Sequence, residues 1–187
     1  PRQMAGLSKS DVYFRIGVPF EKALVPKIRE TIASLKIVNV NRDIRLRKMK
    51  GGCCAHGHKG HENDSAEKGG NDPHTWMDPR LVKKQAKVVR DVLVEIDPEH
   101  GDFYTKRFQK LAADLDRLFS ELSSALAPMR GKEILVFHPA YGYFADAFGL
   151  QQFAVEIEGK EPSAAQLSRV IKIAKKRKIR VIFVQPQ

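Results

Sequence analysis

Residues 11–40 read DVYFRIGVPFEKALVPKIRETIASLKIVNV, and this stretch decides the fold class. Val12–Ile16 is a short, largely apolar run of the kind that forms a buried strand, and Ile37–Val40 is a second one. Between them, after Pro19, apolar residues recur at helical spacing, namely Leu24, Ile28, Ile32 and Leu35. Pro26 is expected to delay the start of this helix or to kink it. A strand, a helix and a strand in this order predict a βαβ unit with a parallel sheet.

Two helices follow in the middle of the chain. Residues 79–96 place their apolar side chains on one broad face, and Asp97-Pro98 ends that helix. A longer helix is predicted from about Asp102 to Leu126, because its apolar residues recur in steps of three and four. From Phe103 to Leu126 this helix would extend about 36 Å at ~1.5 Å per residue, which is enough to cross a whole domain.

The last third of the chain alternates strands and helices again. Strands are predicted at Ile134–Phe137, Phe153–Ile157 and Val181–Val184, and helices at Tyr143–Phe148 and Ala164–Lys176. The whole sequence therefore predicts an α/β protein. It starts without a signal peptide and stops just after a strand-like run, so we expect a piece that is truncated at both ends.

Composition and charge disfavour several classes of protein. Hydrophobic residues make up 42% of the 187 residues and charged residues 29%, which is typical of a globular chain. No apolar run approaches the roughly 20 residues that span a bilayer. The net charge of +11 raises the question of nucleic-acid binding, but the basic clusters at 45–50 and 172–180 lack interleaved aromatic residues that stack on bases. We therefore interpret the charges as solvated helix faces and loop edges, and we expect no nucleic-acid partner.

A histidine-rich segment interrupts the α/β pattern between residues 50 and 73. It contains His56, His58 and His61 among glycines and charged residues, with almost nothing to bury. Imidazole suits zinc, copper and nickel, so accessory metal capture is one interpretation, and a polar linker or a tag-like scar is the other. Cys53 and Cys54 are adjacent, which disfavours a disulfide between them, and their thiolates are further candidates for metal capture.

Two other histidines lie beside structural signals. His74 lies in Asp72-Pro73-His74-Thr75-Trp76-Met77-Asp78-Pro79, where two Asp-Pro turns constrain the backbone on both sides. Taken alone, a histidine beside a tryptophan is more often structural than a ligand. His138 follows a predicted strand directly, and ligands of open α/β sheets collect beyond the carboxyl ends of strands. Spacing along the sequence does not show whether these two histidines meet.

Several segments resemble the metal-binding solute-binding proteins of ABC transporters, especially the zinc-uptake members. The matching segments, in the family's order and at about its spacing, are Asp72–Pro79, Phe137–Phe144, Glu161-Pro162-Ser163 and Val181–Gln187. The resemblance implies two α/β lobes with parallel sheets, joined by one long rigid helix, with a single metal ion in the cleft between the lobes. On this basis residues 1–97 form the remainder of the N-terminal lobe, 98–128 the linking helix and 129–187 the first part of the C-terminal lobe.

The resemblance also implies a metal site. His74 matches the ligand from the first lobe, and His138 matches the ligand from the second. Manganese-type relatives tend to place a carboxylate at the position of His138, so a nitrogen donor there favours Zn²⁺ as the transported ion. The chain departs from the family in two places: a further histidine ligand is expected just before Pro1 and a carboxylate ligand well beyond Gln187. Zinc normally takes four donors, and this chain supplies two of the expected set.

The function implied by the resemblance is zinc capture in the periplasm or another extracytoplasmic space. A monomer would bind the ion and deliver it to the membrane permease of an ABC importer. A manganese-type or iron-type member, or an adhesin-like relative, is the alternative within the family. A zinc metalloenzyme is less favoured, because the sequence has no His-Glu-x-x-His run and no supported general base.

Overall fold

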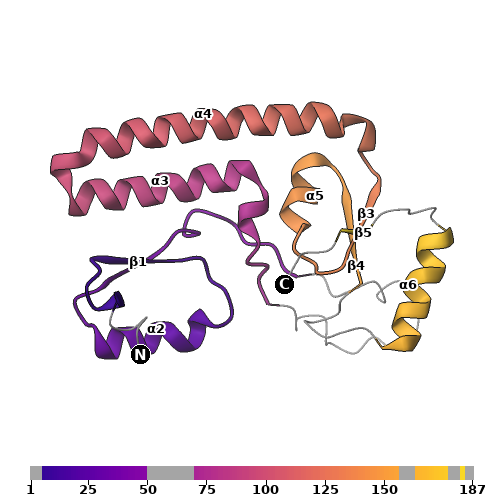
Figure 1. The fold of residues 1–187 in the computed structure, drawn as a ribbon, viewed down its shortest axis with the longest axis horizontal. Helices are drawn as coiled ribbons and strands as arrows, with labels where there is room; N and C mark the ends of the chain where they lie inside the picture. Colours follow the sequence, from indigo (N-terminus) through magenta and orange to yellow (C-terminus); the bar gives the residue numbers. More distant parts are fainter. Residues whose placement is uncertain (1–5, 50–69, 156–162, 177–181, 184–187) are drawn as a thin grey trace. The chain divides into compact units, whose positions relative to one another are not determined.

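Figure 1 shows the computed structural model, which describes residues 6–49, 70–155, 163–176 and 182–183. The described residues form an α/β structure with two small parallel sheets and one long helix, which confirms the predicted fold class. The chain divides into two compact units, namely residues 1–46 with 79–119 and residues 47–78 with 120–187. Among the described helices, none combines the length and the apolar character that a bilayer crossing requires.

The first unit contains the predicted βαβ arrangement. Strands β1 (Val12–Arg15) and β2 (Lys36–Asn39) are parallel, and helix α2 (Glu21–Thr31) connects them. Phe14 lies opposite Val38 in the register of the two strands. The order of apolar runs in the sequence was therefore sufficient to predict both the connection and the parallel pairing.

A carboxylate at the start of helix α2 accepts hydrogen bonds from backbone N–H groups of the preceding turn. Glu21, its first residue, is buried, and its side chain accepts hydrogen bonds from the N–H of Ile16 (3.2 Å) and of Gly17 (2.6 Å). Gly17 has φ = 89°, a left-handed conformation that glycine adopts without strain. Pro26 lies inside the helix, so it does not delay the start, and the helix ends at Thr31.

Two helices complete the first unit. Helix α3 (Pro79–Ile96) contributes Val88 and Val92 to a core that also contains Val38 of β2. The short 3-10 helix η2 (Pro98–His100) then turns the chain, and helix α4 begins next to it. Burial of valine side chains on one face of α3 agrees with the broad apolar face predicted for residues 79–96.

Helix α4 (Gly101–Leu126) is the long helix that the sequence predicts, and η3 (Ala127–Met129) follows it. Its 26 residues extend about 39 Å. It runs alongside α3 (Figure 1), where Lys83 Nζ lies 2.6 Å from Asp116 Oδ2. Residues of α4 up to Phe119 belong to the first unit, and the rest belong to the second.

The second unit is built on a parallel sheet of three strands among the described residues. The strands are β3 (Glu133–Val136), β4 (Gln151–Ala154) and β5 (Ile182–Phe183), in the order β4-β3-β5. Helices α5 (Gly142–Phe148) and α6 (Ala164–Lys176) follow β3 and β4 respectively. The core of this unit contains Leu135, Val155 and Val170.

Strand boundaries in this unit differ from the prediction for β4. The strand starts at Gln151, two residues before the predicted Phe153, and ends at Ala154. Residues 156 and 157 of the predicted strand, and 181 and 184 of the predicted last strand, lie outside the described residues. Helix α5 begins one residue before the predicted Tyr143 and ends at the predicted Phe148.

Candidate metal centre

His74 is held in a short turn by the aspartate two residues before it. Asp72 Oδ1 accepts a hydrogen bond from the backbone N–H of His74 at 3.0 Å, an arrangement in which the aspartate side chain closes its own turn. Pro73 between them fixes its own φ, which pre-organises the same turn. The 3-10 helix η1 (Thr75–Met77) starts directly after His74, and Thr75 is fully buried. The Asp-Pro-His sequence therefore specifies the local backbone at this histidine.

His138 lies just beyond the carboxyl end of β3, the central strand of the described sheet. The preceding Phe137 still belongs to the ladder, because its N–H donates to the carbonyl oxygen of Phe183 at 2.8 Å. The N–H of Ala140 donates to the carbonyl oxygen of His138 at 2.8 Å, which turns the chain away from the sheet. His138 therefore occupies the position at which parallel α/β sheets present ligand-binding residues.

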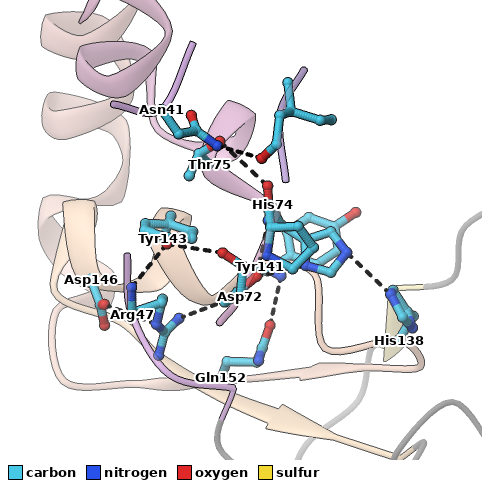
Figure 2. A network of polar contacts seen from close by, with 12 residues as sticks. Asn41, Arg47, Asp72, His74, Thr75, His138, Tyr141, Tyr143, Asp146 and Gln152 are labelled. Atoms are coloured by element: carbon cyan, nitrogen blue, oxygen red, sulfur yellow. Dashed lines mark hydrogen bonds and ion pairs between the residues drawn. The ribbon is translucent and has the colours of Figure 1, made fainter. Parts of the chain in front are cut away.

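The structure brings His74 and His138 together, although they are 64 residues apart in the sequence. Their Nε2 atoms are 3.2 Å apart, and the ring planes meet at 75° with centroids 5.1 Å apart. Figure 2 marks this contact with a dashed line between the two rings. Contacts between η1, which follows His74, and α5, which follows His138, account for this arrangement. Both residues belong to the second unit, and both side chains are partly buried.

A buried carboxylate contacts the other side of the His74 ring. Asp72 Oδ1 lies 2.7 Å from His74 Nδ1, and the Asp72 side chain is only 3% exposed. The Tyr143 hydroxyl donates to the backbone oxygen of Asp72 at 3.0 Å and accepts a hydrogen bond from the N–H of Arg47 at 3.0 Å (Figure 2). Burial raises the pKa of Tyr143, while the Arg47 N–H lowers it and the nearby Asp72 raises it further. This tyrosine therefore stays neutral and able to donate at neutral pH.

Sequence reasoning assigned Asp72 only to a turn and missed its contact with the imidazole. The sequence did contain a signal for this contact, because an aspartate two residues before a histidine can contact both the backbone and the ring of that histidine. Trp76 was noted as a neighbour of His74, and the structure places its ring edge-on to the imidazole, with centroids 5.2 Å apart. Trp76 is 43% exposed, so much of this residue remains in contact with solvent.

The remaining predicted metal-binding residues lie outside the described residues. They are Cys53, Cys54, His56, His58 and His61. Within the described residues, no set of three or more His, Cys, Asp or Glu side chains is grouped so that it could hold an ion. In this part of the chain the candidate centre thus consists of two imidazole nitrogens, backed by the carboxylate of Asp72.

One protein family matches the chain from end to end. The sequence profile described as "Zinc-uptake complex component A periplasmic" (ZnuA) matches residues 1–187. A high-affinity zinc uptake system protein ZnuA of Paracoccus denitrificans is 38% identical over 103 residues, which cover 54% of this chain and 32% of that protein. A manganese-binding lipoprotein MntA of Halalkalibacterium halodurans is 26% identical over 189 residues, which cover 99% of this chain and 57% of that protein.

A solved structure shares the fold. The crystal structure of a ZnuA protein superposes with a TM-score of 0.83 at 34% sequence identity, covering 98% of this chain and 66% of the other. The chain spans about a third to three fifths of the length of the two relatives named above. The activity of a whole relative therefore bears on this chain only as a proposal.

Proposed function

The chain belongs to the ZnuA family of metal-binding solute-binding proteins of ABC importers, and from this premise we propose that it captures Zn²⁺ for import. The proposed ligands in this chain are His74 and His138, each through Nε2. The ion is cargo, which the protein binds and then releases to a membrane permease. The family is one of binding proteins and not of enzymes, so no catalytic residue is assigned.

The distance between the two Nε2 atoms is the observation that carries the proposal. Two nitrogen ligands of a tetrahedral zinc ion, each bound at about 2.0–2.1 Å, are about 3.3 Å apart. The Nε2 atoms of His74 and His138 are 3.2 Å apart. An ion can therefore bind both nitrogens with little movement of either ring, provided that both lone pairs face it.

The chemistry of the donors supports zinc over manganese. Imidazole is a softer ligand than carboxylate, and oxygen donors suit manganese better. Both proposed ligands of this chain are imidazoles. A manganese-binding relative is nevertheless among the similar proteins, so manganese transport is the second candidate function.

A zinc ion requires more donors than these two histidines supply. Zinc is usually four-coordinate, and the described residues offer no third side chain of a suitable kind at the pair. We propose that the other donors come from residues outside the described part of the chain. We propose separately that five further residues capture metal ions as accessory ligands, namely His56, His58, His61, Cys53 and Cys54. We also propose that residues 98–128 form the helix that links the N-terminal lobe (1–97) to the first part of the C-terminal lobe (129–187).

The proposed cycle consists of capture outside the cytoplasm, docking on a permease and release. A periplasmic or other extracytoplasmic location and a permease partner follow from the family, and we propose both for this protein. Because protons and zinc compete for the same nitrogen atoms, we expect affinity to fall in acid.

Calorimetry on the full-length protein tests the ligand assignment. Substitution His74→Ala or His138→Ala should weaken zinc binding at least about tenfold, because each removes one donor nitrogen. His100→Ala is the matched control, since His100 also pairs with an aspartate but lies elsewhere in the fold. Unchanged zinc affinity in both ligand variants would refute the assignment.

A further inference from the structure

The carboxylate of Asp72 contacts the one ring nitrogen of His74 that does not face His138. Asp72 Oδ1 lies 2.7 Å from Nδ1, while Nε2 of the same ring faces the Nε2 of His138. We propose that Asp72 is a positioning residue, which holds the His74 proton on Nδ1 and thereby presents the lone pair of Nε2 to the ion. This inference rests on the proposed function, because it assigns the free lone pair to a bound metal.

The chemistry of the acceptor determines the tautomer of His74. An ionised carboxylate can only accept hydrogen bonds, so the nitrogen that faces it must carry the proton. A neutral imidazole has one N–H and one lone pair, which leaves the lone pair of His74 on Nε2. A neutral histidine in water prefers the opposite tautomer, with its proton on Nε2. Asp72 must therefore reverse the intrinsic preference of the ring before any ion arrives.

Three contacts hold Asp72 itself. Its backbone oxygen accepts the Tyr143 hydroxyl, and its backbone N–H donates to the carbonyl oxygen of Arg47 at 2.8 Å. The Arg47 guanidinium forms a long ion pair with the carboxylate, with Nη1 3.8 Å from Oδ2. Arg47 also pairs with the more exposed Asp146 through Nε, at 3.4 Å. The first two contacts fix the backbone of Asp72, and the ion pair with Arg47 is the one of the three that reaches its buried carboxylate.

Gly142 makes room for this arrangement. A Cβ atom at position 142 would lie 1.5 Å from Arg47 Nη1 and 2.9 Å from Asp72 Oδ2. Any side chain here would displace the guanidinium, which is the far end of a flexible side chain, and would press on the Asp72 carboxylate as well. Gly142→Ala therefore disturbs the support of Asp72 without altering either proposed ligand.

The two rings should differ in the absence of metal. With its lone pair on Nε2, His74 accepts a hydrogen bond across the 3.2 Å gap, so the donor must be the Nε2–H of His138. When zinc binds the neutral His138 ring through Nε2, the ring must carry its single proton on Nδ1, so the proton on Nε2 is released to solvent and another is taken up at Nδ1. Zinc binding should then change the tautomer of the His138 ring and leave the tautomer of His74 unchanged.

Nitrogen-15 NMR of the imidazoles in the full-length protein tests the proposal directly. In the metal-free protein we expect His74 as the Nδ1–H tautomer and His138 as the Nε2–H tautomer. After addition of zinc we expect a large ¹⁵N shift with loss of the Nε2–H signal for His138, and a retained Nδ1–H signal for His74. A metal-free His74 that carries its proton on Nε2 would overturn the proposal, whatever its effect on affinity.

Variants then separate positioning from turn formation. Asp72→Ala should shift His74 toward the Nε2–H tautomer and weaken zinc binding by about 10–100-fold. Asp72→Asn keeps the shape and an acceptor oxygen but loses the charge, so its loss of affinity should be smaller. Gly142→Ala should weaken binding less than Asp72→Ala does. Asp97→Asn, which changes the exposed aspartate beside His100, is the matched control and should leave zinc affinity unchanged.

The outcomes distinguish this inference from the proposed function. If His74→Ala weakens zinc binding but Asp72→Ala and Asp72→Asn both leave the tautomer and the affinity unchanged, Asp72 only forms the turn, and the inference is wrong. If neither His74→Ala nor His138→Ala weakens zinc binding, the proposed function fails, while the tautomer in the metal-free protein still reports on Asp72. Should Asp72→Ala fail to fold, the wild-type spectrum and Asp72→Asn decide the question.

Discussion

Two histidine–aspartate pairs occur in the described part of this chain, and their surroundings differ. In one, His74 Nδ1 lies 2.7 Å from Asp72, with the side chains 12% and 3% exposed. In the other, His100 Nδ1 lies 2.9 Å from Asp97, with the side chains 66% and 36% exposed. The contacts are nearly equal in length, so the hydrogen bond alone does not distinguish a candidate metal ligand from a surface histidine.

The difference lies in what each ring faces and what holds each carboxylate. His74 faces a second imidazole, and its aspartate is supported by Tyr143 and Arg47. The pair of His100 lies at the η2 turn between α3 and α4, where the Tyr104 hydroxyl also donates to Asp97. Compared with the pair of His100 and Asp97, the pair of His74 and Asp72 therefore has two additional features: a second nitrogen donor nearby, and a carboxylate that is buried and supported.

The largest expected difference is in stabilisation by zinc. At a free zinc concentration of about one hundred times Kd, binding stabilises a folded protein by about 2.7 kcal/mol, which raises Tm on the order of 5–10 °C for a chain of this size. Wild type and His100→Ala should both show this rise, and His138→Ala should lose most of it at the same zinc concentration. Differential scanning calorimetry with and without zinc provides the measurement. A full rise in His138→Ala would show that the second imidazole contributes nothing.

Replacing the second imidazole by a carboxylate should change the choice of metal. His138→Asp exchanges a softer nitrogen donor for an oxygen donor, which suits manganese better. We expect the preference for zinc over manganese to fall by about tenfold or more, as measured by competition titrations with both metals. An unchanged preference would mean that the residues outside the described part of the chain set the selectivity. A preference for manganese in the wild type would favour the second candidate function.

Disrupting the exposed pair of Asp97 and His100 should have only a small effect on stability. Hydrogen bonds from Tyr104 and then from His100 lower the pKa of Asp97. The stability that these hydrogen bonds contribute is fully present above the ordinary aspartate pKa of about 3.9. It is lost as the pH falls through the lowered pKa of Asp97 in the folded protein. Asp97→Asn should therefore lower Tm at neutral pH by no more than about 2 °C, because the pair is exposed.

The same variant should also lose part of the acid dependence of Tm below about pH 4, without any change in zinc binding. Thermal melts between pH 2 and pH 7, with wild type in parallel, check both points. A Tm loss of more than about 5 °C at neutral pH, or a loss of zinc affinity, would remove the contrast between the two pairs.

The fold could be predicted largely from sequence periodicity, because each element buries a regular set of apolar residues. Helix α4 and the βαβ unit are examples, and their order also fixes the parallel pairing. Strand β4 was misplaced by two residues, because it starts with Gln151 and Gln152. Polar residues at the start of an outer strand of the described sheet leave no apolar signal.

The candidate site was only partly predictable. His74 and His138 were identified from neighbouring turns and from resemblance, but their contact joins elements 64 residues apart and depends on the packing of η1 against α5. The role of Asp72 was missed, because turn formation alone is a sufficient reason for an aspartate at this position. Arg47 and Tyr143 contact Asp72 from distant parts of the sequence, which no local pattern indicates.

The most direct test of the central claim is an anomalous difference map at the zinc edge from crystals of the zinc-loaded full-length protein. We predict one strong peak within about 2.0–2.1 Å of the Nε2 atoms of both His74 and His138. A zinc peak that touches neither ring, or that binds His74 through Nδ1 in place of the Asp72 contact, would contradict the account.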